Sequence, residues 1–137
     1  MCNTKHIVFI LAALLLAACG STAKITKPVE VSALPDVVQV AAGEWHTCAR
    51  VADGQVFCWG FNLNGTLGDG TTADKLVPNN PVQTLWNATQ LTAGERHNCV
   101  LTEDRDVLCW GYNGAGQLGN GTAADAVAPV RTSLDCQ

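Results

Sequence analysis

The stretch CWGFNLNGTLGDGT at residues 58–71 decides the fold, because it returns 51 residues later as CWGYNGAGQLGNGT at residues 109–122. The upstream segment AGEWHTC (residues 42–48) returns in the same way as AGERHNC (residues 93–99). At this shift, 19 of the 37 positions from 42 to 78 are identical without a gap. Self-similarity at a fixed period is the signature of a repeat architecture. The chain is therefore expected to hold two copies of one structural unit.

The first copy contains a β-hairpin signal between its two cysteines. The segment VADGQV (residues 51–56) places an Asp-Gly turn between two apolar, partly alternating stretches. A three-residue loop puts Gly54 at the left-handed position that this turn prefers, and the resulting register pairs Cys48 with Cys58. Counting outward from the turn, the cysteines fall on a non-hydrogen-bonded pair, where Cα atoms lie about 4.5 Å apart, within disulfide range. We expect this bridge to form.

The second copy keeps the spacing at Cys99 and Cys109, but Arg105 replaces the turn glycine and leaves the loop geometry open. A second bridge is still expected, because an exported chain meets oxidising conditions. Zinc is the rival use of four cysteines and two histidines, but structural zinc sites favour paired ligands two to four residues apart. No metal is therefore expected. Cys136 is left over, which indicates an intermolecular bridge, a missing partner or a free thiol.

The N-terminal segment predicts export and a lipid anchor. Residues 7–18 form an apolar run that follows Lys5 and is too short to span a bilayer, as in a signal peptide. The run ends in LAACG (residues 16–20), which resembles the lipobox of bacterial lipoproteins. That resemblance implies cleavage before Cys19 and acyl chains on this residue, which attach the protein to a membrane. The alternative is a simple export signal with an accidental cysteine.

The expected location is the outer membrane of a two-membrane cell, on its periplasmic side or at the cell surface. The reason is that Gly20 and Ser21 lack the aspartate that resembles an inner-membrane retention signal. We divide the chain into a signal peptide (1–18), a flexible tether (19–36), a first repeat (37–86), and a second repeat with a truncated end (87–137). Past the cut, seven Lys and Arg face twelve Asp and Glu. This acidic balance makes nucleic acid an unfavourable partner.

The motifs AGExH, CWGxN and GxLGxGT resemble the repeat of the regulator of chromosome condensation family, over about residues 38–129. Bacterial members often carry similarly paired cysteines. The resemblance implies an all-β fold of four-stranded antiparallel blades arranged as a propeller, usually of seven. Glycines would supply the tight bends, and four large side chains would fill the space between neighbouring blades, namely Trp59, Leu67, Trp110 and Leu118.

Two copies cannot close such a ring, because a stack of repeats needs about three units before every apolar face is covered. We expect first a truncated or degenerate gene product. The second expectation is assembly with further copies that complete a propeller. An open pair standing alone would expose strand edges that invite aggregation.

The repeated polar residues are expected to be structural rather than catalytic. His46 and Glu44 recur as His97 and Glu95, and a catalytic residue is needed once whereas a packing residue is needed in every unit. The segments DGT (residues 69–71) and NGT (residues 120–122) resemble fragments of calcium loops, but they lack the full ligand series and suit turns equally well. We therefore expect no enzymatic activity and no cofactor.

Positions that differ between the copies are the better guide to binding. Trp45 stands where the second copy has Arg96, Leu63 and Asn64 are also variable, and Trp86 lies in the connecting segment. Trp and Arg are the side chains most often found at interface hot spots. We expect these residues on loops at one face of the propeller, the alternative being that both tryptophans pack between blades.

The leading functional hypothesis is a non-enzymatic protein-binding or scaffold module, anchored at the envelope, whose protein partner is unknown. The alternative is inhibition of an envelope hydrolase such as a β-lactamase, since one secreted member of the propeller class inhibits β-lactamases through its loop face. A third reading is guanine nucleotide exchange, the activity of the eukaryotic namesake. Export separates the chain from cytosolic GTPases, so exchange ranks last.

Overall fold

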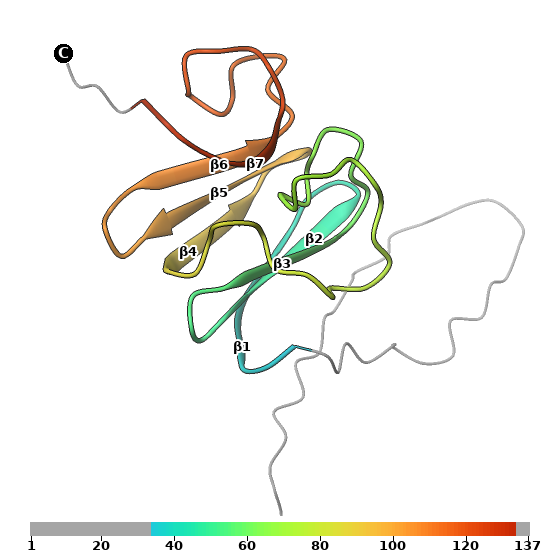
Figure 1. The fold of residues 1–137 in the computed structure, drawn as a ribbon, viewed down its shortest axis with the longest axis vertical. Coiled ribbons are helices and arrows are strands. Elements are labelled where there is room, and N and C mark those ends of the chain that lie inside the picture. Colours follow the sequence, from blue (N-terminus) through green and yellow to red (C-terminus); the bar gives the residue numbers. More distant parts are fainter. Residues whose placement is uncertain (1–33, 134–137) are drawn as a thin grey trace, which may run out of the picture.

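A computed structural model describes residues 34–133, which form two antiparallel sheets, called here blade 1 and blade 2 (Figure 1). Within this described range every regular element is a strand and no helix occurs, so the all-β prediction is confirmed. The two blades do not close a ring. Blade 1 contains β1 (Val37–Ala42), β2 (His46–Val51) and β3 (Val56–Gly60), and blade 2 contains β4 (Ala88–Ala93), β5 (His97–Thr102), β6 (Val107–Gly111) and β7 (Ala126–Arg131).

The hairpin of blade 1 has the predicted register. Val51 N donates to Gln55 O at 3.0 Å and closes a three-residue loop in which Gly54 has a φ of 86°. Cys48 therefore lies directly opposite Cys58, with 4.1 Å between the Cα atoms, and the two are joined by a disulfide. The short Cα separation is that of a non-hydrogen-bonded pair, as the sequence indicated.

The hairpin of blade 2 has the same loop in spite of its missing glycine. Thr102 N donates to Asp106 O at 2.9 Å, and Cys99 pairs with Cys109 through the second disulfide. Arg105 occupies the left-handed position with a φ of 65°. A side chain there costs about 1–2 kcal/mol relative to glycine. The pairing of the strands thus imposes this loop on a residue that disfavours it.

The two blades differ in their fourth strand. Blade 2 is four-stranded as predicted, with β7 beside β6, whereas blade 1 has only two isolated bridges beside β3. These bridges join Gly60 to Lys75 and Phe57 to Pro81. Pro78 cannot be the reason, because its equivalent Pro129 lies inside β7, whereas Pro81 has no such equivalent and has no backbone N–H to donate to the ladder.

The blades pack face to face, and each has two distinct faces. We call the face that carries the disulfide the front and the face that carries the tryptophan of the CWG motif the back. The front of blade 1 covers the back of blade 2. The shared core contains Cys48, Val56, Cys58, Leu67, Val82, Leu85, Ala88, Leu91, Val100 and Trp110.

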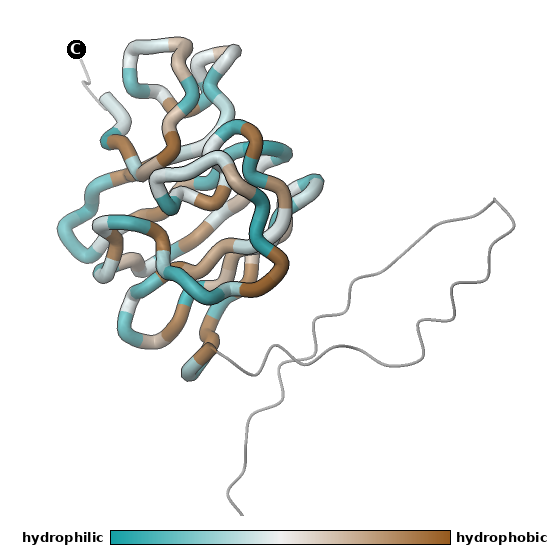
Figure 2. The backbone as a smooth tube through the Cα atoms, turned by 45° about the vertical axis from the view of Figure 1, so that its right-hand side comes forward, coloured by the Kyte–Doolittle hydropathy of each residue, from teal (hydrophilic) through white to brown (hydrophobic). Residues whose placement is uncertain are grey.

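The interblade fillers expected from the sequence behave unequally. Leu67, Leu118 and Trp110 are buried, whereas Trp59 on the back of blade 1 is half-buried. Leu118 is buried within blade 2 itself, in a small cluster with Cys109 and Ala126, whereas Trp110 is buried against the front of blade 1. Figure 2 shows hydrophobic and hydrophilic stretches alternating along the backbone tube.

A buried asparagine organises the glycine-rich loop of each repeat. Asn62 Nδ2 donates to Ala73 O at 2.9 Å and to Thr71 O at 3.1 Å, while its Oδ1 accepts from Leu67 N at 2.8 Å. Asn113 makes the equivalent bonds in the second repeat. One side chain thus satisfies several backbone groups that a loop would otherwise bury unpaired.

Several sequence predictions lie outside the described residues. These are the signal peptide, the lipidated Cys19, most of the tether, and Cys136.

Candidate functional site

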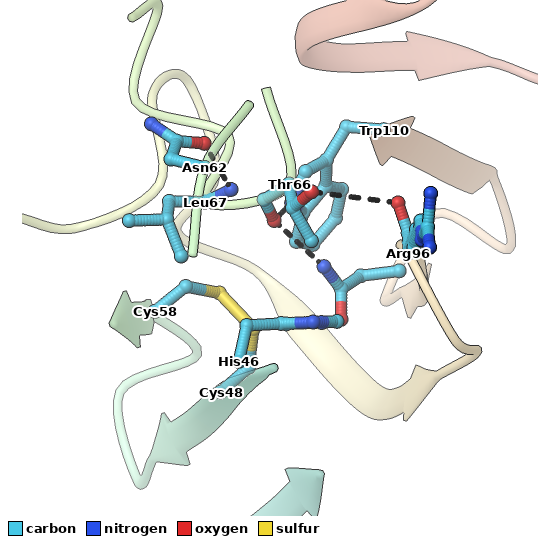
Figure 3. The surroundings of a disulfide bond; sticks show 9 residues. His46, Cys48, Cys58, Asn62, Thr66, Leu67, Arg96 and Trp110 are labelled. Carbon is cyan, nitrogen blue, oxygen red and sulfur yellow. Dashed lines mark hydrogen bonds between the residues drawn. A yellow bond between two sulfur atoms is a disulfide. The ribbon is translucent and has the colours of Figure 1, made fainter. Parts of the chain in front are cut away.

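The repeated histidine of blade 1 lies in the interface between the blades, within the network of Figure 3. His46 Nε2 lies 2.8 Å from Asn98 Oδ1, and Asn98 Nδ2 donates to Thr66 O at 2.8 Å. The second bond fixes the amide orientation of Asn98, so its Oδ1 is an acceptor and His46 Nε2 carries the proton. Trp110 Nε1 donates to the same Thr66 O at 3.0 Å. His46 thus has the packing and hydrogen-bonding role expected for a residue that recurs in each copy.

Burial sets the charge state of His46. Loss of hydration lowers the pKa of its imidazole below the usual value, the bond to Asn98 works in the opposite direction, and the charge of His97 lowers the pKa further. The net shift is downward, so the imidazole is neutral at pH 7. A neutral donor suits the carbonyl oxygen of Asn98 and avoids an uncompensated buried charge.

The calcium-like segment of the first repeat forms a turn. Asp69 Oδ1 accepts from Thr71 N at 2.9 Å and from Thr71 Oγ1 at 2.7 Å, and its other oxygen forms an ion pair with Lys75. Burial alone would raise the pKa of the Asp69 carboxyl, but the bonds from Lys75 and Thr71 outweigh it and lower the pKa. Among the described residues no group of three or more His, Cys, Asp and Glu side chains is arranged to hold a metal ion.

An exposed aromatic surface lies at one end of the strands, where β2 begins and β3 ends. We call it the Trp45 surface, and it surrounds a shallow hollow of about 510 Å³. Trp45 and Leu63 are 65% and 66% exposed. Large apolar side chains gathered in one hollow are typical of protein interaction sites rather than of an ordinary surface. The residues that line it are Trp45, Gly60, Phe61, Leu63, Asp74, Leu76 and Arg96.

Close backbone contacts hold the two aromatic residues of this surface together. Phe61 N donates to Trp45 O at 2.9 Å. Gly60, with a φ of 111°, allows this approach, because a Cβ at this position would lie 2.5 Å from Trp45 O. The glycine of the CWG motif therefore fixes the relative position of Trp45 and Phe61.

Arg96 brings the second repeat into the Trp45 surface. It occupies in blade 2 the position that Trp45 has in blade 1, and its Nε lies 3.5 Å from Glu44 Oε2 and 3.9 Å from Glu95 Oε1. These pairs are solvated and contribute little to stability. The guanidinium therefore remains available to a partner at the rim of the hollow.

The structure brings together only some of the predicted binding residues. Trp45, Leu63 and Arg96 line one hollow. Asn64 instead donates to Asp125 Oδ2 at 2.7 Å and so links the first repeat to the second. Trp86 is 66% exposed at the opposite end of the strands, where its carbonyl lies beside Gly54 in the hairpin loop. Neither tryptophan packs between blades.

Phe61 and Leu76 belong to the Trp45 surface but were not singled out from the sequence. The signal for Phe61 was available, because an aromatic residue follows the CWG motif in both copies, as Phe61 and Tyr112. Leu76 is 94% exposed and gave no such signal, because its position depends on the irregular edge of blade 1.

The regulator of chromosome condensation (RCC1) repeat matches residues 37–66 and 88–117, and a second form of the same repeat matches residues 16–50 and 53–101. The chain belongs to the RCC1 repeat family. The first pair of matches begins at β1 and at β4, so each RCC1 repeat in that pair opens with the first strand of a blade.

RCC1 proteins from eukaryotes are similar over most of this chain. The ultraviolet-B receptor UVR8 of Arabidopsis thaliana is 35% identical over 118 residues, covering 83% of this chain and 27% of the receptor. The probable E3 ubiquitin-protein ligase HERC3 of Homo sapiens is 37% identical over 100 residues, covering 72% of this chain and 10% of the ligase. The chain therefore spans about a quarter or less of the length of these relatives.

Two solved structures resemble the described fold closely. The structure of Prp20p from Saccharomyces cerevisiae has a TM-score of 0.69 and 27% identity, covering 80% of this chain and 27% of Prp20p. Human WBSCR16 has a TM-score of 0.68 and 26% identity, covering 77% of this chain and 28% of that protein. The two sheets thus correspond to blades of an RCC1 propeller. RCC1 propeller repeats support a protein-binding scaffold module, and the Prp20p structure was described together with binding to Gsp1p and histones.

The described residues contain no helix that is long and apolar enough to cross a membrane.

Proposed function

We propose that this chain is a non-enzymatic scaffold, held at the outer membrane by acyl chains on Cys19, that binds a protein partner through the Trp45 surface. The observation that carries the proposal is the hollow in which Trp45, Phe61 and Leu63 stand exposed beside Arg96. Aromatic and arginine side chains supply most of the energy at protein interfaces. The RCC1 family and its propeller fold support a protein-binding role.

The sequence before β1 supports the location. The lipobox-like segment at residues 16–20 would place the acyl chains about seventeen residues before the first strand. Several acyl chains hold a protein on a membrane far more firmly than one, because each buried methylene contributes about 0.8 kcal/mol. The polar residues of the tether would let the Trp45 surface reach partners near the membrane.

A capture experiment with matched variants tests the proposal. The mature lipidated chain serves as bait in detergent extracts of the envelope, beside a Trp45→Ala, Leu63→Ser double variant. Trp86→Ala is the control, since this tryptophan is equally exposed at the other end of the strands. We expect wild type and control to retain the same protein and the double variant to lose at least tenfold. Equal capture by all three chains would remove the Trp45 surface from the proposal.

The location has its own test. Intact mass of the membrane fraction should show acyl chains on the mature protein, and Cys19→Ala should abolish both the mass increase and the membrane retention. An unmodified mature chain would overturn the anchor while leaving the binding proposal intact.

Inhibition of an envelope hydrolase is the second candidate. Trp45 and Leu63 stand exposed on loops at one end of the blades, and projecting apolar loops can enter the concave site of an enzyme. Assays of β-lactamases and other envelope hydrolases, with and without the purified chain, test this candidate. Inhibition that is lost on Trp45→Ala would support it, and full activity at micromolar chain concentrations would remove it.

A further inference from the structure

Within the part of the chain that the structure describes, the front of blade 2 and the back of blade 1 are the two faces against which no other blade packs. A front face and a back face of the same kind already meet inside the molecule, where the front of blade 1 packs against the back of blade 2. Each residue of a covered face has an equivalent 51 positions away in the sequence, on the uncovered face of the other blade. The internal interface therefore predicts what fits the uncovered faces.

Two glycines on the front of blade 1 receive side chains from the back of blade 2. A Cβ at Gly68 would lie 2.7 Å from Trp110 Nε1, and a Cβ at Gly65 would lie 2.5 Å from Val127 Cα. Trp110 is 0% exposed as a result. The glycines thus form two recesses that fit a tryptophan and an aliphatic residue.

The same recesses occur on the front of blade 2, where they are open. A Cβ at Gly116 would meet no atom within 4 Å, and one at Gly119 would meet only Thr132, at 3.8 Å. The side chains that match these recesses lie on blade 1. They are Trp59, which is only half-buried at the position equivalent to the fully buried Trp110, and Leu76, which is 94% exposed at the position equivalent to Val127.

A polar contact follows the same pattern. Gln39 on β1 binds the backbone of Leu91 on β4 in both directions, donating to its carbonyl at 2.7 Å and accepting from its amide at 3.1 Å. The equivalent of Gln39 in the second repeat is Gln90, which is exposed and, together with Gln39 itself, lines a hollow of about 390 Å³ that borders both blades. The equivalent of Leu91 is Val40 on β1.

We propose that the front of blade 2 binds the back of blade 1 of a second copy of this chain, so that copies associate head to tail. Trp59 and Leu76 of one copy then occupy the recesses at Gly119 and Gly116 of the next, and Gln90 binds the backbone of Val40. A head-to-tail interface produces a closed ring when its rotation completes a turn. The chain covers 27% and 28% of two similar solved structures, so three or four copies give a comparable length.

One internal contact is not reproduced, and it provides a variant. The position of Asn98, which binds His46 inside the chain, is occupied by Thr47 in blade 1. His97 of one copy would therefore meet a threonine of the next. Thr47→Asn supplies the missing amide, and one added hydrogen bond should tighten the association by about threefold to tenfold.

The first measurement is the mass of the mature lipidated chain in detergent, by native mass spectrometry over a range of concentrations. We expect particles of three or four chains. Trp59→Arg places a charge in the Gly119 recess and should weaken association at least a hundredfold, with an unchanged circular dichroism spectrum. Trp86→Ala, outside both faces, should associate like wild type. A single chain at about 100 μM, in wild type and in Thr47→Asn, would overturn the proposal.

A mixing experiment tests the head-to-tail geometry. Trp59→Arg blocks the back of blade 1, and Gln90→Glu blocks the front of blade 2, because a carboxylate cannot donate to the carbonyl of Val40. Each variant alone should remain a single chain, since its one intact face finds no intact counterpart. An equal mixture should give a two-chain particle and nothing larger. A mixture that stays monomeric, or a single variant that assembles fully, would contradict the geometry.

Discussion

Blade 1 and blade 2 share their motifs but bury them differently. His46 and Cys48 are buried while His97 and Cys99 are half-buried, and Trp59 is half-buried while Trp110 is fully buried. The reversal follows the order of the blades, because within residues 34–133 only the front of blade 1 and the back of blade 2 pack against another blade. A repeat sequence therefore specifies both halves of an interface, and position in the array decides which of these side chains another blade covers.

Replacing the two tryptophans should produce the largest difference in stability between the blades. Trp110→Ala should lower the free energy of unfolding by about 3–5 kcal/mol, because it empties a packed site and leaves Thr66 O without its indole donor. Trp59→Ala should cost only roughly 1 kcal/mol in a single chain. Urea denaturation at a concentration where chains are monomeric measures both. Equal losses would show that blade order does not control the energetics.

The next largest effect is the pH dependence of the free energy of unfolding that arises from the buried His46. The pKa of His46 is lowered in the folded chain, so below about pH 6.5 the unfolded chain binds more protons. The stabilisation that depends on a neutral His46 is fully present above this pH and is lost as the pH falls toward the folded pKa. His46→Gln keeps an amide donor for Asn98 and should flatten the profile between pH 7 and 5. Identical slopes in both chains would place the titration elsewhere.

The smallest expected effect comes from the two hairpin loops. Arg105→Gly relieves a left-handed residue in blade 2 and should raise the free energy of unfolding by about 0.5–1 kcal/mol, after the entropy of the unfolded glycine is included. The reciprocal Gly54→Arg should lower it by at least ~2 kcal/mol. The added cost at Gly54 arises because a Cβ there would lie 2.7 Å from Trp86 O. Thermal unfolding of both variants measures the difference, and a destabilising Arg105→Gly would refute the strain argument.

The repeat made much of the fold predictable. The spacing of Cys48, Gly54 and Cys58 determined the hairpin register, because a disulfide and a turn glycine are satisfied together in one pairing only. The broken fourth strand of blade 1 was not foreseen, since Pro78 is shared by both copies and only the additional Pro81 separates them.

The candidate site was less predictable than the fold. Comparing the copies singled out Trp45, Leu63 and Arg96, which the structure places together, but it also selected Asn64 and Trp86, which lie elsewhere. Sequence differences mark positions that vary and carry no information about which end of a strand they occupy. Trp86 lies in a connection without a counterpart in the second repeat, so nothing in the repeat could place it.

Each disulfide joins adjacent strands of one hairpin, ten residues apart, and neither crosses from one blade to the other. Each of the two blades therefore contains a complete disulfide of its own. Duplicating or deleting a whole hairpin would leave none of these four cysteines without its partner, and no new disulfide pairing would be required. This arrangement lets the number of blades change by a single genetic event without disturbing the pairing of the cysteines.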